Sequence, residues 1–323
     1  MSKRLEGLKS SSSFYATIGL IVLVLFCALI SGNFRSGDNL ITILRQASIL
    51  LILSTGLTAV LLTGEIDLSV GSTAGLIGCI CARLLKMDMP ILAVFLIGIC
   101  LGALIGCFNG FLVGVIKLPS FVATYATNWV AGGLATIVMS GSVIYNLPQG
   151  FTWFGTGYVL FVPVVVIIAA VMLVIAYILL QKTTFGRDVY ALGSNAEAAR
   201  YSAVPVKRTL FLTFVMCSVC AAVAGLLMTA RLNAADTAMG DAYGLQTVAA
   251  VVIGGTSMLG GEGSVTGTIA GALMLTVVVN IMNLVGISSN AQPIVVGFVI
   301  IVMVMFDSYR RIVSDRVKPA LRT

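Results

Sequence analysis

The stretch Thr63-Gly64-Glu65-Ile66-Asp67-Leu68-Ser69-Val70-Gly71-Ser72 places two carboxylates between segments that are almost wholly apolar. Glu65 and Asp67 are the only charged residues from Gln46 to Ala82. A carboxylate costs several kcal/mol to bury in hydrocarbon. Such a pair therefore marks a functional site unless it lies at a membrane exit or in a wet cavity.

The composition of the rest of the chain indicates an integral membrane protein. Of the 323 residues, 59% are hydrophobic and only 10% are charged, whereas soluble domains carry roughly a quarter charged residues. The net charge of +7 does not reflect a nucleic-acid-binding patch, because Lys and Arg fall in short loops and at the two ends. The chain has no histidine, the commonest metal ligand, and we expect neither a metal nor a cofactor.

The seven cysteines all fall inside apolar segments. Cys217 and Cys220 have the spacing of a redox or metal motif, but their neighbours are apolar, so we interpret them as part of a packed helix face. No histidine is present, and no cysteine or serine sits beside an evident base. These features argue against a membrane enzyme.

Apolar runs of the length of one crossing predict an all-α polytopic membrane protein with about ten transmembrane helices, forming a single domain over residues 1–323. The first span is expected to remain uncleaved, because no small-x-small cleavage site follows it. The predicted spans are 14–31, 40–62, 68–84, 90–108, 119–140, 158–180, 209–230, 242–259, 264–284 and 291–307.

The basic residues predict the orientation of these spans. With the N-terminus in the cytoplasm, fourteen of the 19 Lys and Arg residues fall in inside segments and four in outside loops, and Arg45 lies near the outer end of the second span. Cytoplasmic loops carry such an excess of positive charge. Both termini are therefore predicted to face the cytoplasm.

Small and polar residues inside the spans predict how the helices meet. Glycines recur at every fourth position over 98–114 and 263–271, and Gly71 and Gly75 repeat the spacing, which favours close helix packing. Polar side chains within spans need partners from protein or water, which indicates an internal passage. These polar residues are Arg45, Gln46, Asn128, Gln246, Asn280 and Asn283.

The longest hydrophilic interior segment, 181–208, predicts a short helix at the membrane surface. Ser194-Asn195-Ala196-Glu197 has the pattern of a capping box, with Ser194 as the N-cap and Glu197 reaching back. Alanines favour helix after it and Pro205 stops it. A capped helix with a compact alanine face is typical of a docking site for a soluble partner; a solvated helix without a partner is the alternative.

Several motifs in order resemble one family. Over essentially its whole length the chain is similar to the permease subunits of bacterial ABC importers for ribose and related monosaccharides. The matching segments are NLITILRQAS at 39–48, TGEIDLSVGS at 63–72, LPSFVAT at 118–124, YALGSNAEAA at 190–199, AAVVIGGTS at 249–257 and the glycine pair at 260–261.

The resemblance implies a multi-pass permease of the bacterial inner membrane. Two copies, identical or paralogous, would form the pore, with an ATP-binding subunit inside and a sugar-binding protein outside. The chain has no G-x-x-x-x-G-K-[ST] stretch that could bind ATP itself. The loop 181–208 would carry the coupling helix that docks on the ATPase, through Gly193, Ser194, Asn195, Glu197, Ala198, Ala199 and Arg200.

The resemblance also implies an inverted repeat of helices 2–5 and 7–10. In that repeat 64–68 corresponds to 243–248, where family members often carry Glu-Leu-Asp at 244–246 and this chain has Gly-Leu-Gln. The exchange keeps a hydrogen-bond acceptor at position 246 and removes its charge. The identity of the sugar or polyol therefore stays open.

Two alternatives stay open for the acidic stretch. Asp67 either caps the following helix with the help of Ser69 or lines the pathway, and Glu65 has no assigned role. In a rival function, an ion-coupled secondary transporter, Glu65 and Asp67 would bind the coupling proton or sodium. The predicted pathway and gate residues are Arg45, Gln46, Glu65, Asp67, Ser69, Gln246 and Asn280.

Overall fold

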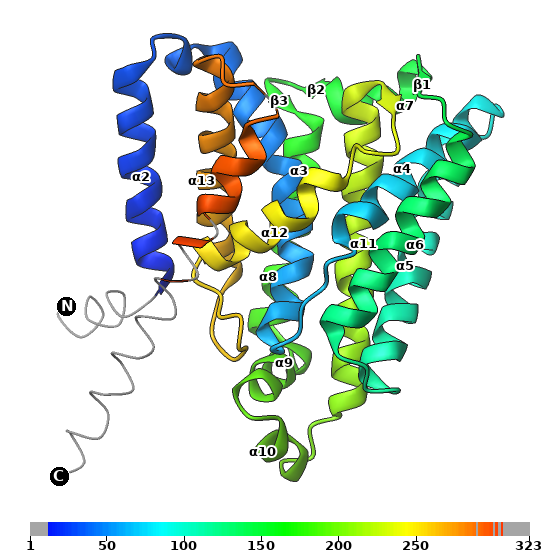
Figure 1. The fold of residues 1–323 in the computed structure, drawn as a ribbon, viewed down its shortest axis with the longest axis vertical. Helices are drawn as coiled ribbons and strands as arrows, with labels where there is room; N and C mark the ends of the chain where they lie inside the picture. Colours follow the sequence, from blue (N-terminus) through cyan, green and yellow to red (C-terminus); the bar gives the residue numbers. More distant parts are fainter. Residues whose placement is uncertain (1–11, 289, 300, 303–304, 306–323) are drawn as a thin grey trace.

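The computed structural model describes residues 12–288, 290–299, 301–302 and 305 (Figure 1). It is mostly helical, as predicted. The helices are α2 (Ser12–Ile30), η1 (Asn33–Arg35), α3 (Gly37–Leu62), α4 (Val70–Lys86), α5 (Ile91–Gly114), α6 (Ser120–Met139), α7 (Gln149–Thr156), α8 (Val164–Lys182), α9 (Thr184–Ser194), α10 (Ala196–Tyr201), α11 (Val206–Leu232), α12 (Asp241–Ile253) and α13 (Val265–Leu284).

Six helices of the described chain are long and apolar enough to cross a membrane: α3, α5, α6, α8, α11 and α13. The apolar part of α2 and the 13-residue α12 are shorter. These helices confirm a polytopic membrane protein, while the count of about ten crossings stays a prediction. The last predicted span, 291–307, lies partly outside the described residues.

Three helix boundaries lie several residues away from the predicted spans. The segment predicted to start at residue 158 first forms a hairpin of β2 (Tyr158–Val159) and β3 (Val162–Pro163), so α8 begins only after Pro163. Helix α12 ends at Ile253 because Gly255 adopts a φ of +90°, which a helix does not permit. Helix α5 continues to Gly114 through residues predicted to be a loop.

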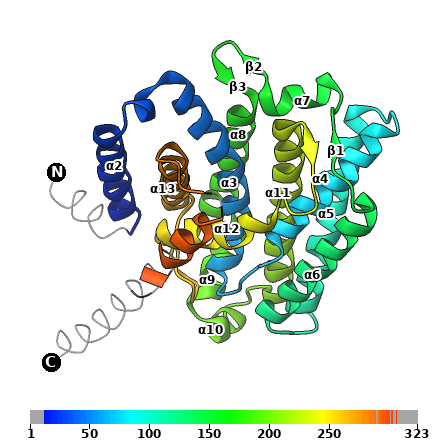
Figure 2. The same ribbon diagram turned by 45° about the horizontal axis from the view of Figure 1, so that its top comes forward.

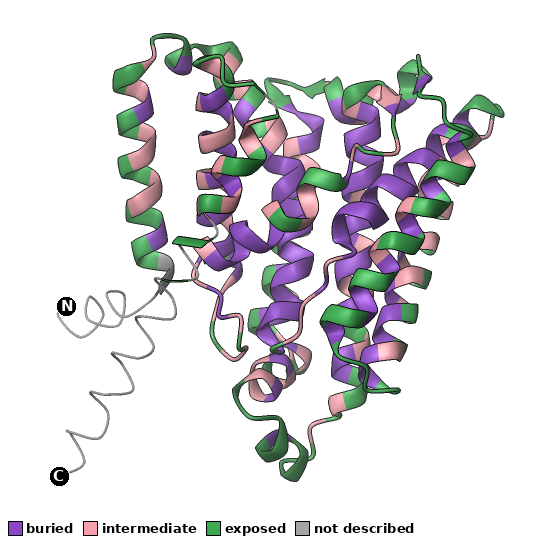
Figure 3. Cartoon of the chain, viewed as in Figure 1, coloured by how far each residue is buried: buried purple, intermediate pink, exposed green. Residues whose placement is uncertain are grey.

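Helices α3 and α11 form the centre of the bundle. Helix α11 packs against α3, α4 and α5, and α13 packs against α2, α3 and α12. Figures 1 and 2 both show α2 and α13 on one side of this centre and α5 and α6 on the other. The central helices are buried, while α2, α5 and α6 expose their outer faces (Figure 3), as helices facing lipid do.

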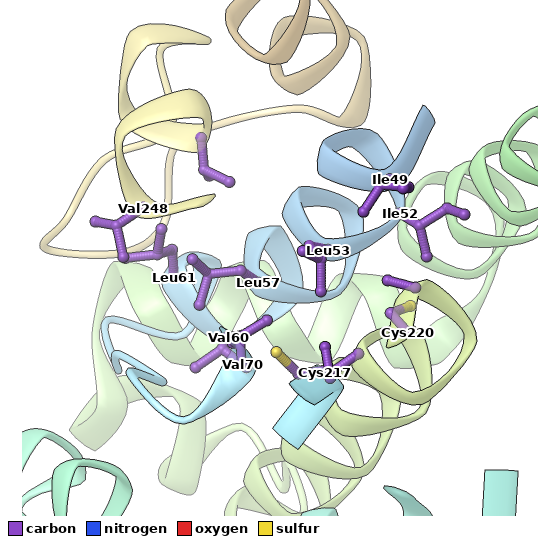
Figure 4. Packing of buried hydrophobic residues seen from close by; sticks show 14 of the residues in the cluster. Ile49, Ile52, Leu53, Leu57, Val60, Leu61, Val70, Cys217, Cys220 and Val248 are labelled. Carbon is purple, nitrogen blue, oxygen red and sulfur yellow. The ribbon is translucent and has the colours of Figure 1, made fainter. Parts of the chain in front are cut away.

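The core of this centre is an apolar cluster between α3 and α11. Leu53, Leu57 and Val60 are fully buried on α3 and face Cys217 and Cys220 of α11 (Figure 4). All seven cysteines are free thiols, and these two are buried in the cluster. The interpretation of the Cys217 and Cys220 pair as a packed helix face is confirmed.

The glycine stripe of α5 is a contact surface for α11. A Cβ on Gly102 would meet Ala222 and Ser218, one on Gly106 would meet Val215, and one on Gly110 would meet Phe211. The helix axes approach closely because no side chains separate them. Gly271 of α13 makes the same kind of approach to Ala250 of α12. The predicted packing role of these stripes is confirmed.

The first turns of α4 and α12 meet in the middle of the bundle (Figure 1). A Cβ on Gly71 would collide with the carbonyl oxygen of Gly240, and a Cβ on Gly240 would collide with the carbonyl oxygen of Gly71. Both short helices therefore start inside the bundle, each preceded by non-helical chain.

The two ends of the bundle carry different structures. At one end two short antiparallel pairs join the connections: β1 (Ile144–Tyr145) pairs with β4 (Ala234–Ala235), and β2 pairs with β3. At the other end α9 and α10 project beyond the spanning helices (Figure 1). The loop predicted to dock a partner thus lies at the tip of the molecule.

Candidate functional site

The segment between α3 and α4 crosses part of the bundle without helical hydrogen bonds, and side chains of α6 pair with its backbone. Ser120 Oγ accepts a hydrogen bond from the Ile66 amide at 3.1 Å, and Thr124 Oγ1 accepts one from the Leu68 amide at 3.1 Å. Irregular backbone inside a membrane protein needs such partners. Helix α6 therefore holds the acidic segment extended.

Asp67 begins a chain of buried hydrogen bonds across three helices. Its Oδ1 accepts from the amide of Ser69 at 2.8 Å and from the Ser69 hydroxyl at 2.6 Å. Asn109 Nδ2 of α5 donates to Ser69 Oγ at 3.0 Å, and Thr127 Oγ1 of α6 donates to Asn109 Oδ1 at 2.6 Å. The network links the starting point of α4 to α5 and α6.

These bonds support the capping alternative for Asp67. Its side chain is 1% exposed, and it lines neither of the two polar cavities described below. Helix α4 begins at Val70, two residues later than predicted, with Ser69 as the N-cap residue. The aspartate thus fixes the amide of Ser69, the residue immediately before the first turn.

A cavity of about 160 Å³ lies among α3, α11, α12 and α13. It brings together two predicted pathway residues, Gln46 of α3 and Gln246 of α12. Arg231 and Tyr243 also line it, and both were missed because Arg231 counted as a loop charge and Tyr243 as part of the repeat. We call this space the outer cavity.

Two other predicted pathway residues have structural partners instead. Arg45 Nη2 donates to the carbonyl oxygen of Thr156 at 2.8 Å, and its guanidinium lies 4.9 Å from the ring centroid of Tyr158. Asn280 exchanges two side-chain hydrogen bonds with Asn39, at 3.1 and 2.8 Å. Arg45 thus attaches α7 and β2 to α3, and Asn280 ties α13 to α3.

A second cavity, of about 430 Å³, lies beside α10. We call it the inner groove. Glu65 lines it with the basic side chains of Lys117, Arg200 and Lys207. Burial raises the pKa of the Glu65 carboxyl, and a hydrogen bond with Ser120 lowers it by less. The acidic segment and the predicted docking helix therefore share one cavity.

The cap of α10 differs from the predicted capping box. Asn195 is the N-cap, and its Oδ1 accepts a hydrogen bond from the Ala198 amide at 2.9 Å. Ser194 is instead the last residue of α9, where its hydroxyl donates to the carbonyl oxygen of Tyr190. The prediction of Ser194 was wrong because α9 occupies residues that looked like a loop.

Replacement of the cap provides a local test. We expect Asn195→Ala to raise hydrogen exchange at the Ala198 amide about fivefold, because losing an N-cap costs about 1 kcal/mol. Ser194→Ala should leave that amide unchanged. Hydrogen–deuterium exchange of the purified chain measures both. Equal effects from the two substitutions would contradict Asn195 as the cap.

Helix α9 contacts the end of α3 through main-chain atoms. A Cβ on Gly193 would collide with the carbonyl oxygen of Leu62, and that same oxygen accepts a hydrogen bond from the Gly261 amide at 2.9 Å. Tyr190 Oη donates to the carbonyl oxygen of Gly263 at 2.9 Å. We call this contact of α9, the end of α3 and the loop after α12 the glycine joint.

Helix α10 presents a small exposed face. Glu197, Ala198 and Arg200 are exposed, whereas Ala199 is 3% exposed and packs inward. Tyr201, which sequence reasoning missed, is 92% exposed at the end of the helix. An exposed aromatic side chain next to charged residues is typical of an anchor at a protein interface.

The comparisons with known proteins agree on one family. Residues 39–304 match the family described as branched-chain amino acid transport system / permease component. The chain is 38% identical to the ribose import permease protein RbsC of Haemophilus influenzae over 296 residues, which is 90% of this chain and 92% of that protein.

Other relatives extend the comparison. The ribose import permease protein RbsC of Bacillus subtilis is 39% identical over 293 residues, 90% of this chain and 91% of that protein. The D-allose transport system permease protein AlsC of Escherichia coli is 32% identical over 288 residues, 89% of this chain and 88% of that protein. No solved structure matches the chain.

Proposed function

This chain belongs to the family described as branched-chain amino acid transport system / permease component, and we propose that it moves a monosaccharide or similar polyol into the cell. It is a ribose-type permease subunit of an ABC importer and a multi-pass protein of the inner membrane. ATP hydrolysis resides on a separate ATP-binding subunit, and a substrate-binding protein is the other general partner of such a permease.

The glycine joint carries the proposal, because it connects the predicted ATPase docking helix to the acidic segment. Helix α10 follows directly on α9, and Gly193 of α9 contacts Leu62, the last residue of α3. Glu65 follows three residues later in the inner groove beside Arg200. Movement of α10 on ATP binding would therefore displace both the end of α3 and the segment that begins α4.

Co-purification tests this function. We expect the wild-type chain, purified from its native membrane in mild detergent, to retain an ATP-binding subunit. The exchange Glu197→Arg with Arg200→Glu should release that subunit, and Tyr201→Ala should weaken its retention about tenfold or more, because truncation of an aromatic anchor costs about 2 kcal/mol.

Phe161 provides a matched control for Tyr201. It is an aromatic residue that is 93% exposed, and it lies between β2 and β3 at the opposite end of the bundle. Phe161→Ala should retain the ATPase fully. An ATPase that binds all of these variants equally would show that α10 is not its docking site.

The repeat, the single domain, the orientation and the second permease copy are also part of the proposal. Nine helices coincide with the first nine predicted spans, and the meeting of Gly71 with Gly240 supports an inverted repeat of helices 2–5 and 7–10. The single domain over 1–323, the cytoplasmic termini and a second permease copy or close paralogue in the pore complete it. Cysteine labelling from either side of the membrane at Leu160 and Tyr201 tests the orientation.

The rival ion-coupled function finds no support in these contacts or relatives. Oδ1 of Asp67 accepts two hydrogen bonds from Ser69, while its Oδ2 is buried without a partner among the described residues. The named relatives are import permeases. Uptake that persisted after ATP depletion and followed an ion gradient would overturn the importer.

A further inference from the structure

The outer cavity contains a cation without a counter-charge. Arg231 projects from the last turn of α11, and its Nε is buried with no hydrogen-bond partner. Its guanidinium makes no ion pair or hydrogen bond with the residues that the structure describes. The Arg231 side chain is half-buried, and a guanidinium partly withdrawn from water is normally paired, because an unpaired charge keeps its desolvation penalty.

The other polar residues of the outer cavity are neutral. They are Gln46, Tyr243, Gln246 and Thr276. Gln46 Oε1 is likewise buried without a partner. The nearest acids along the chain, Asp236 and Asp241, are exposed and do not line the cavity. Asp236 already accepts hydrogen bonds from Thr237 and Ala238. The cavity therefore has one unpaired positive charge beside two amides.

We propose that the outer cavity binds a small polyhydroxylated solute that carries an anionic group, a carboxylate or a phosphate. The guanidinium of Arg231 binds the anion, since its planar fork fits both groups, and Gln46 and Gln246 pair with hydroxyls. A volume of about 160 Å³ suits one monosaccharide-sized molecule. This substrate class deepens the proposed import function and rests on it.

A neutral sugar would leave the cavity unsatisfied. Its hydroxyls can pair with the two glutamines, but they cannot neutralise Arg231, and a hydrogen bond between charged groups is stronger than one between neutral groups. An anionic solute supplies the missing counter-charge. Preference for the anion should therefore depend on Arg231 and weaken at high salt.

Direct binding to the purified full-length chain tests the inference. The probes are D-ribose, D-ribonate and D-ribose 5-phosphate, titrated by calorimetry or by thermal shift in detergent. We expect D-ribonate or D-ribose 5-phosphate to bind at least about tenfold more tightly than D-ribose, in line with one charge-assisted hydrogen bond. The probe of the two that binds better identifies the anion. Equal binding of all three, or binding of none, would overturn the proposal.

Three variants test whether the preference for the anion arises in the outer cavity. Arg231→Gln should abolish the preference for the anion, and Arg83→Gln, which removes an exposed arginine from α4 outside the cavity, should preserve it. Gln246→Asp supplies an acid inside the cavity, so the affinity for the anion relative to that for D-ribose should fall about tenfold. An anion preference that survives both cavity variants would place the anion elsewhere.

These measurements separate the inference from the import function. Binding to the isolated chain needs no ATPase, so absence of anion preference would overturn only the substrate class. Loss of ATPase co-purification would overturn only the importer. If Arg231→Gln fails to fold, the wild-type comparison and Gln246→Asp still decide the result.

Discussion

Replacement of Gly71 by valine is expected to prevent the chain from folding and to abolish uptake. The added side chain would occupy the position of the Gly240 carbonyl oxygen and lie against the backbone of Gly244. Neither contact can be relieved by a change of rotamer, because both are with main-chain atoms. Separating α4 from α12 would open the centre of the bundle, and we expect no monodisperse protein after detergent extraction.

Gly133 supplies the control for that substitution. It is an exposed glycine in α6, and a Cβ there would meet nothing within 4 Å. Gly133→Val should therefore give wild-type yield and uptake, and its loss of glycine favours the helix slightly. Size-exclusion profiles and uptake of labelled substrate measure both variants. Folded, active Gly71→Val protein would contradict the close crossing of α4 and α12.

Two substitutions of Asp67 are expected to distinguish the loss of its hydrogen-bond acceptor from the loss of its charge. Asp67→Ala removes the acceptor for the amide and hydroxyl of Ser69, which leaves two buried polar groups unpaired and lowers stability on the order of 3 kcal/mol. Asp67→Asn keeps an oxygen at the same position. We expect the asparagine variant to lie within about 1 kcal/mol of wild type, because the hydrogen bonds are retained.

Thermal unfolding and uptake, measured for Asp67→Ala and Asp67→Asn, distinguish a structural role of Asp67 from a role of its charge in transport. If Asp67 is structural, the asparagine variant unfolds and transports like wild type, and the alanine variant loses both properties. A folded asparagine variant that transports nothing would instead assign a role to the charge. That outcome would revive the ion-coupled alternative with Asp67 as its site.

The helices and the family could be predicted from the sequence because their signals are local. Apolar runs of the length of one crossing predicted nine segments that are helical in the structure, and the spacing of Gly102 and Gly106 predicted a contact face. Each signal depends on residues a few positions apart. Such patterns do not require knowledge of which helices are neighbours.

The predictions from sequence were incomplete where contacts with other helices determine the place of a residue. Asn109 looked like a loop residue, yet α5 continues through it because Ser69 and Thr127 supply partners for its side chain. Asn280, predicted to line the pathway, hydrogen-bonds Asn39, and its place in the pathway stays a prediction. Arg231 was counted as a loop charge, and only the three-dimensional arrangement shows that it lines a cavity together with residues of α3, α12 and α13.

The glycine joint has a consequence for how strictly ATP use is tied to transport. Its closest approaches are between main-chain atoms of Gly193, Leu62 and Gly261, and the Tyr190 side chain adds one hydrogen bond. Most of the connection therefore contains no side-chain rotamer that could change under load. A linkage that deforms so little would transmit the movement of α10 to the end of α3 almost completely. We therefore expect little futile ATP turnover in the assembled importer, and bulkier residues at the joint should increase that slippage before they reduce ATP hydrolysis.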